Sequence, residues 1–263
     1  MSVQLDVGRA YMKVAHAECH PHGLAAEYIG TRLAHEFGLR TFDFGLIELS
    51  ESDASSLAPE IRCDAGPAFV TRTLSRLEWN GKGRLLQRVP AGVLARLVVF
   101  DTWLRNDDRY PPVDAIGALQ SSWPPNRDNV FLTEDGALDG ALELIAMDFG
   151  RAMIGGREFT SRLSHVDCIK DPWVYGLYPV FLPFTTPGLV QTALADLGRV
   201  RPESIQEVVA AVPGAWQVGV RERETIVRHL VDRAHFLVDN VPRMLPRCEV
   251  QRGLYGEGGP HHD

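Results

Sequence analysis

The chain has 263 residues, of which 45% are hydrophobic and 23% are charged, as in a soluble protein with one large core or two lobes. Its formal net charge of −7 argues against nucleic acid or an anionic membrane as the main partner. The four cysteines form no CxxC pair, no signal-peptide pattern opens the sequence, and no apolar run is long enough to cross a membrane. We therefore expect a cytoplasmic protein with reduced thiols that binds neither nucleic acid nor a membrane.

The first part of the chain alternates short β-branched runs with one helical segment. Residues 2–14 predict two strands around an Asp-Val-Gly turn, and an i+4 apolar repeat predicts a helix over 24–37. The stretch "TFDFGLIELS" predicts a strand that ends in the polar turn "SESDASS", and residues 68–74 predict another strand. This β-β-α-β-β order indicates a small N-terminal lobe over residues 1–75.

From about residue 90 the pattern becomes mainly helical. A helix is expected over "AGVLARLVVFDTWL", and "NVFLTEDGALDGALELIAMDFG" predicts a strand, a turn at "EDG" and a second strand. The clearest later helix is expected over 220–241. We predict an α+β protein whose larger, mainly helical lobe covers 76–250, with a flexible tail over 251–263 and a cleft between the lobes.

Three acidic or amide positions point to metal chemistry. Asp108 follows the helical run in a polar loop, and a hairpin would bring Asn129 and Asp148 side by side at its open end. Two oxygen ligands there suit Mg²⁺, which completes its shell with water and phosphate. A third carboxylate could orient or deprotonate an attacking hydroxyl. Each motif alone is compatible with a simple turn, but their order and their expected secondary structure favour the metal site.

These motifs resemble those of the HipA-like kinase family. The resemblance rests on "FDTWLRNDDR", "NRDNVFL" and "LIAMDFG", and extends to "YMKV" and "GLAAEYIGTRLAHEF". It implies a two-lobed protein-kinase-like fold that uses ATP and Mg²⁺. In that fold Asp108 would be catalytic, while Asn129 and Asp148 would bind the metal. Lys13 would contact the ATP phosphates, and Glu27 would pair with it.

Several neighbouring residues have more than one interpretation. Lys13 alone would be an ordinary surface residue of a strand, and the glutamate-bearing helix after it reverses that preference. Asp107 is interpreted as a turn or capping residue, and Arg109 could either orient Asp108 or form a surface ion pair. The stretch "AFVTRTL" is placed between the lobes, where a hinge would offer backbone groups to adenine.

The loop "HAECHPHG" gathers three histidines around one cysteine. His16, His20 and His22 could form a metal site with Cys19, but their spacing matches no standard zinc pattern. The loop is flanked by glycine and proline. We therefore expect these histidines, together with His35, to be solvated.

Two features depart from the family pattern. Only twelve residues precede Lys13, and Gly8 is the only glycine among them, so we expect a short or missing phosphate loop. Asp108 and Asn129 lie 21 positions apart, whereas about five positions separate the corresponding kinase residues. The proline-containing insertion over 109–128 could shape a substrate surface or misplace the catalytic groups.

The sequence therefore predicts an ATP- and Mg²⁺-dependent kinase of HipA-like type. The resemblance implies a Ser or Thr of an unidentified protein as the acceptor, and a toxin–antitoxin role with an antitoxin as partner. The alternative is a pseudokinase or interaction module with a truncated phosphate-binding loop, which relies on a partner chain for the missing N-terminal strand. A third interpretation is a metal-dependent phosphohydrolase built on the same carboxylates.

Overall fold

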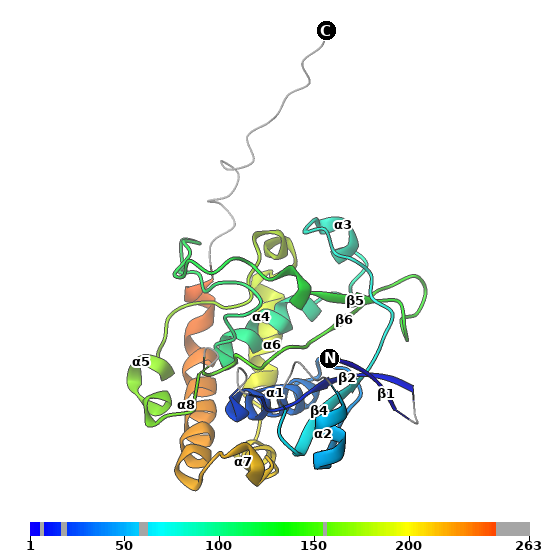
Figure 1. Ribbon diagram of the computed structural model, residues 1–263. Helices are drawn as coiled ribbons and strands as arrows, with labels where there is room; N and C mark the ends of the chain where they lie inside the picture. Colours follow the sequence, from blue (N-terminus) through cyan, green and yellow to red (C-terminus); the bar gives the residue numbers. More distant parts are fainter. Residues whose placement is uncertain (6–7, 17–19, 58–62, 155–156, 246–263) are drawn as a thin grey trace.

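The computed structural model has a small part built on a sheet and a larger helical part (Figure 1). It describes residues 1–5, 8–16, 20–57, 63–154 and 157–245. The small part holds a four-stranded antiparallel sheet in the order β1-β2-β4-β3. Its strands are β1 (Ser2–Leu5), β2 (Gly8–Lys13), β3 (Phe44–Leu49) and β4 (Gly66–Arg72). All four strands were predicted from the sequence.

The helix after β2 begins earlier than the sequence suggested. Helix α1 (Pro21–Glu36) starts three residues before the predicted 24–37, inside the expected histidine loop. The ring of His20 caps it by accepting the His22 N–H at 3.2 Å, and Pro21 occupies the first helical position, where its fixed φ suits a helix.

The predicted turn "SESDASS" is wrong, because a second helix, α2 (Glu51–Leu57), occupies it. Ser50 and Asp53 form a reciprocal capping box: the Asp53 N–H donates to Ser50 Oγ at 3.1 Å, and the Ser50 N–H donates to Asp53 Oδ2 at 3.2 Å. These hydrogen bonds hold the pKa of Asp53 below its ordinary value. The polar composition that indicated a turn therefore encodes a helix start.

The stretch "AFVTRTL" does not lie between the two parts. Most of it forms β4, an inner strand that pairs with both β2 and β3. The connection to the helical part follows Arg72, and it joins the second part where the Leu77 N–H donates to the Leu132 carbonyl at 2.8 Å. The residues after β4, rather than "AFVTRTL", therefore connect the two parts.

The helical part is built around α4 (Val93–Leu104), in which nearly every side chain is buried. Helix α4 packs against α6 and α8, and the indole N–H of Trp103 donates to the Leu230 carbonyl at 2.8 Å. The helices of this part are α3 (Gly83–Leu86), α4, α5 (Val166–Ile169), α6 (Pro187–Leu197), α7 (Pro202–Ala210) and α8 (Val220–Met244). The mainly helical character predicted beyond residue 160 is confirmed.

The predicted hairpin is present as β5 (Phe131–Thr133) and β6 (Glu143–Ile145), paired antiparallel. The link between these strands is longer than the predicted "EDG" turn, and Asn129 lies in a short 3-10 turn (Arg127–Asn129) before β5 rather than inside a strand. Both differences shorten the strands, while the open end of the hairpin keeps its predicted position.

One continuous core joins α1 to the helical part, because buried residues of α1, α4, α6 and α8 belong to the same cluster. A separate small cluster covers the other face of the sheet. No helix in the described ranges combines the length and the apolar character needed to span a membrane. The lobe boundary at residue 75 stays a prediction, and the predicted tail over 251–263 lies outside the described residues.

Candidate active site

Lys13 is held between two carboxylates that come from distant parts of the chain. Its Nζ donates to Glu27 Oε2 at 2.8 Å and to Asp148 Oδ1 at 2.6 Å. Lys13 ends β2, Glu27 lies on α1, and Asp148 follows β6. The sheet, the helix and the hairpin therefore meet at one ammonium group.

The electrostatics of this trio keep the lysine charged. Burial raises the pKa of Glu27, and the ammonium of Lys13 opposes that rise. Burial alone would lower the pKa of Lys13, but the charges of Glu27 and Asp148 outweigh it and raise the pKa above its ordinary value. The Lys13 side chain is still 42% exposed. A fixed cation that solvent can reach is suited to contact the oxygens of a phosphate.

A second pair of polar residues lies beside this trio. Asn129 Nδ2 donates to Asp108 Oδ2 at 2.8 Å, and the side chain of Asn129 is buried. Asn129 and Asp148 flank the open end of the β5–β6 hairpin, and the charge of Asp148 acts directly on Asp108. The structure therefore brings the predicted residues together, and the role of each stays a prediction.

The insertion over 109–128 does not displace this pair, because it is closed at its base. The Asn126 N–H donates to the Arg109 carbonyl at 3.1 Å. The hydroxyl of Tyr178 lies 2.7 Å from the carbonyl oxygens of both residues. The two ends of the insertion therefore lie side by side, and the residues that precede and follow it stay close together.

Arg109 is a buried structural residue, unlike either interpretation from the sequence. Its side chain is 0% exposed, and its Nε donates to Asp101 Oδ2 at 2.7 Å. Its terminal nitrogens donate to the carbonyl of Asn129 and, at 3.1 Å, to the carbonyl of Met147. Arg109 therefore ties α4 to the backbone on both sides of the hairpin opening. No contact with Asp108 is found within the described part of the chain.

Asn106 fixes the turn that carries Asp108, although the sequence assigned it no role. It is fully buried, its Nδ2 donates to Asp101 Oδ1 at 3.0 Å, and its Oδ1 accepts the Asp108 N–H at 3.3 Å. An asparagine two positions before a turn residue is the spacing of an Asx turn. That spacing could have identified Asn106.

Arg151, which follows the Asp-Phe-Gly sequence, faces both carboxylates of the loop. Its Nε lies 3.4 Å from Asp107 Oδ1 and 3.5 Å from Asp108 Oδ1. Its guanidinium carbon lies 5.2 Å from the ring centroid of Trp123, an exposed residue of the insertion. Asp107 lies in a turn, as expected, but it also forms an ion pair that the sequence did not predict.

These surroundings make Asp108 a better proton acceptor than an ordinary aspartate. Burial and the charge of Asp148 raise the pKa of Asp108. The hydrogen bond from Asn129 and the cation of Arg151 act in the opposite direction, and the net shift is upward. A raised pKa favours proton uptake from a hydroxyl.

Phe149 connects the hairpin to α1. It is fully buried, and its ring meets Phe100 of α4 edge to face with centroids 5.4 Å apart. Gly30 gives it room on α1, since a methyl group there would lie 2.5 Å from Phe149 Cγ. This close approach places α1, and with it Glu27, next to Asp148.

Comparison with known proteins agrees with this geometry. The model of the HipA-like kinases matches residues 4–114. Over this segment the chain is similar to the HipA-like kinases. The segment contains Lys13, Glu27 and Asp108, and the resemblance stated from the sequence is confirmed over these residues. Asn129 and Asp148 lie beyond it.

The fold of the whole chain is similar to that of a crystal structure of a Helicobacter pylori proinflammatory kinase, CtkA. The TM-score is 0.58 at 13% sequence identity, and the match covers 92% of this chain and 90% of the other. The two-lobed protein-kinase-like fold is therefore confirmed, and the comparisons support a kinase-type phosphotransferase. No curated protein matches the chain.

The residues of this site fit a magnesium ion. Asp148 uses Oδ1 for Lys13, and its Oδ2 has no protein partner among the described residues. Asn129 uses its nitrogen for Asp108, which leaves its Oδ1 without a partner in the same ranges. Two available oxygens of this kind suit Mg²⁺, which prefers few protein ligands. No group of three or more His, Cys, Asp or Glu that could hold a metal ion occurs anywhere in the described ranges, so the fit rests on these two oxygens.

The expectation that the loop histidines are solvated is wrong for His22. His22 lies on α1 and is buried; its Nδ1 accepts the Phe159 N–H at 2.9 Å, and its Nε2 lies 3.2 Å from the Gln217 carbonyl. His20 caps α1, and its Nε2 lies 3.1 Å from Glu158 Oε1. Cys19 lies outside the described residues.

Proposed function

We propose that the chain is an ATP- and Mg²⁺-dependent phosphotransferase of HipA-like type. The observation that carries the proposal is the position of Lys13, which contacts Glu27 and Asp148 at once. A lysine paired with a helical glutamate is the arrangement that positions ATP phosphates in protein kinases. Here the pair is already formed, next to the residue proposed to hold the metal.

Each residue of the site has one proposed task in the transfer. Lys13, oriented by Glu27, holds the phosphate oxygens, and Asn129 and Asp148 hold Mg²⁺, which neutralises charge on the phosphates. The acceptor hydroxyl oxygen forms a bond to the γ-phosphorus while the bond to the bridging β–γ oxygen breaks. ADP leaves, and the hydroxyl proton passes to Asp108.

The acceptor is proposed to be a Ser or Thr of a protein. The proposal is supported by the HipA-like match over residues 4–114. A role in a toxin–antitoxin pair, with an antitoxin as partner, rests on the family resemblance alone. The cytoplasm is the proposed location.

Binding of Mg·ATP is the first test, with a matched pair of variants. Asp148→Asn removes a proposed metal ligand, and Asp139→Asn makes the same chemical change at an exposed position. Both aspartates have a positive φ, which asparagine tolerates. At 100 times the Kd, Mg·ATP should raise the Tm of the wild type and of Asp139→Asn by about 5 to 11 °C. It should leave Asp148→Asn unchanged.

Turnover is the second test. We expect the wild type to transfer the γ-phosphate to a Ser/Thr peptide library, and Asp108→Asn to bind Mg·ATP but transfer phosphate about 10²- to 10⁴-fold more slowly. A protein that gains no stability from Mg·ATP and makes no ADP would be a pseudokinase or interaction module. Release of phosphate from small esters without any nucleotide would instead indicate a phosphohydrolase.

A further inference from the structure

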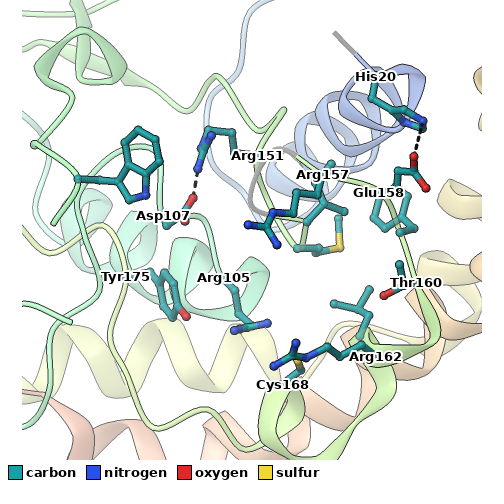
Figure 2. A pocket seen from close by; sticks show the side chains of 15 residues that line it. His20, Arg105, Asp107, Arg151, Arg157, Glu158, Thr160, Arg162, Cys168 and Tyr175 are labelled. Carbon is teal, nitrogen blue, oxygen red and sulfur yellow. Dashed lines mark hydrogen bonds and ion pairs between the residues drawn. The ribbon is translucent and has the colours of Figure 1, made fainter. Parts of the chain in front are cut away.

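A large pocket lies next to the proposed active site. Its volume is about 970 Å³, and its walls come from the turn after α4, the segment after Asp-Phe-Gly and the loop before Tyr175 (Figure 2). Asp107 and Arg151 belong to its lining, and Arg151 also faces Asp108. The pocket therefore opens beside the carboxylate proposed to receive the proton.

Arginine dominates this pocket. Its lining contains Arg105, Arg151, Arg157 and Arg162, against the acidic residues Asp107 and Glu158. Both acidic residues are already engaged, Asp107 with Arg151 at 3.4 Å and Glu158 with His20 at 3.1 Å. A chain of net charge −7 thus carries a locally basic cavity at its proposed site.

Three of the guanidinium groups converge, and among the described residues only one of them, Arg105, has an acidic partner, Asp171. Figure 2 shows the heads of Arg105, Arg157 and Arg162 turned toward the same part of the pocket. The guanidinium groups of Arg157 and Arg162 form no hydrogen bond or ion pair with any described residue. Cations that gather in this way repel one another unless an anion lies between them. The arrangement is that of an anion site.

Arg105 gives this site a fixed wall. Its Nε donates to Asp171 Oδ2 at 2.8 Å, and the Tyr175 hydroxyl donates to the same oxygen at 2.5 Å. Asp171 is buried, and Arg233 donates to its carbonyl from α8 at 3.3 Å. The two terminal nitrogens of Arg105 have no partner in the described part of the chain and remain available for carboxylate or phosphoryl oxygens.

We propose that this pocket binds anionic side chains of the protein substrate, flanking the acceptor Ser or Thr. The inference deepens the proposed kinase function and rests on it. Carboxylates in the pocket would be held by the guanidinium forks, while the neighbouring hydroxyl reaches Asp108 past Arg151. The substrate class is therefore an acidic or already phosphorylated peptide segment.

The first test measures peptide binding without nucleotide, so that it does not depend on catalysis. Three fluorescent peptides share one Ser, flanked by Glu, by phosphoserine or by Gln. We expect the Glu and phosphoserine peptides to bind the full chain at least about tenfold more tightly than the Gln peptide. A larger gain for phosphoserine than for Glu would identify phosphoryl groups as the preferred anion, and equal gains would identify carboxylates as sufficient.

The variant Arg157→Gln/Arg162→Gln removes two exposed cations whose guanidinium groups have no partner among the described residues. It should lose at least about tenfold in affinity for the acidic peptides and little for the Gln peptide. The control Arg221→Gln/Arg228→Gln makes the same change of net charge on the exposed face of α8, where neither arginine lines the pocket. It should bind all the peptides as the wild type does.

The outcomes separate the two proposals. Tight binding of acidic peptides without phosphate transfer would support the proposed anion pocket and contradict the proposed kinase activity. Transfer to the Gln peptide as efficient as transfer to the Glu peptide would support the kinase and overturn the pocket. An equal loss of affinity in both double variants would also overturn it, because overall charge would then explain the binding.

Discussion

Replacement of Arg109 by methionine should be among the most destabilising single changes in the chain. Methionine keeps the apolar volume but leaves the buried carboxylate of Asp101 without its cation, and it removes the bonds to the carbonyls of Asn129 and Met147. Breaking a buried ion pair in this way costs about 3–5 kcal/mol of unfolding free energy. For a protein of this size, that corresponds to a fall in Tm of about 6 to 20 °C.

A matched pair on the surface provides the control. Arg199 and Asp196 form an ion pair at 2.8 Å, nearly the length of the buried pair, but the Arg199 side chain is 77% exposed. Arg199→Met should therefore change the unfolding free energy by no more than about 1 kcal/mol. Thermal unfolding followed by circular dichroism, with urea unfolding as a second measure, compares both variants with the wild type.

The double variant Asp101→Asn/Arg109→Met tests the reason for the loss. If the buried unpaired charge is the cause, neutralising Asp101 should recover part of the stability, with an interaction energy of about 1–3 kcal/mol. Simple additivity of the two single changes would refute this reasoning. So would a cost for Arg109→Met as small as that for Arg199→Met.

Three further changes probe the site. Asp108→Asn should lower kcat by about 10²- to 10⁴-fold in a phosphate-transfer assay while leaving the Tm shift with Mg·ATP intact, and a loss of that shift would contradict a purely catalytic role. Gly30→Ala should cost about 1–3 kcal/mol of unfolding free energy by crowding Phe149, whereas Gly188→Ala, with nothing within 4 Å, should be nearly neutral. Arg151→Met removes a cation that lowers the pKa of Asp108, so the acid limb of the kcat/KM profile should move to higher pH; an unchanged limb would mean that another group controls it.

The errors in the secondary-structure prediction came from polar residues that are common both in turns and at the first positions of helices. The sequence "SESD" was interpreted as a turn because serine and aspartate favour turns, but the same residues close a capping box between Ser50 and Asp53 that starts α2. His20 and Pro21 were assigned to a loop although they begin α1. Local composition limits such a segment to a few conformations, and the packing of the element that follows selects one.

The role of Arg109 shows a different limit. An arginine beside two aspartates predicts an ion pair, but the sequence does not identify the partner. The partner is Asp101, on the preceding helix, and the other contacts are carbonyls brought close only by the hairpin. Hydrogen bonds to backbone groups of distant segments cannot be predicted from the local sequence.

The sequence by itself determined most of the order of the elements and indicated the candidate residues of the site. Strand, helix and hairpin patterns brought Asp108, Asn129 and Asp148 together, because local periodicity fixes local structure, and the resemblance to the HipA-like kinases added Lys13 and Glu27. Only the tertiary structure decided whether the insertion over 109–128 separates those residues. It does not, because the insertion closes at its base, and contacts between its two ends depend on the whole fold. The basic pocket was also not predicted from the sequence, since its arginines come from two separate segments.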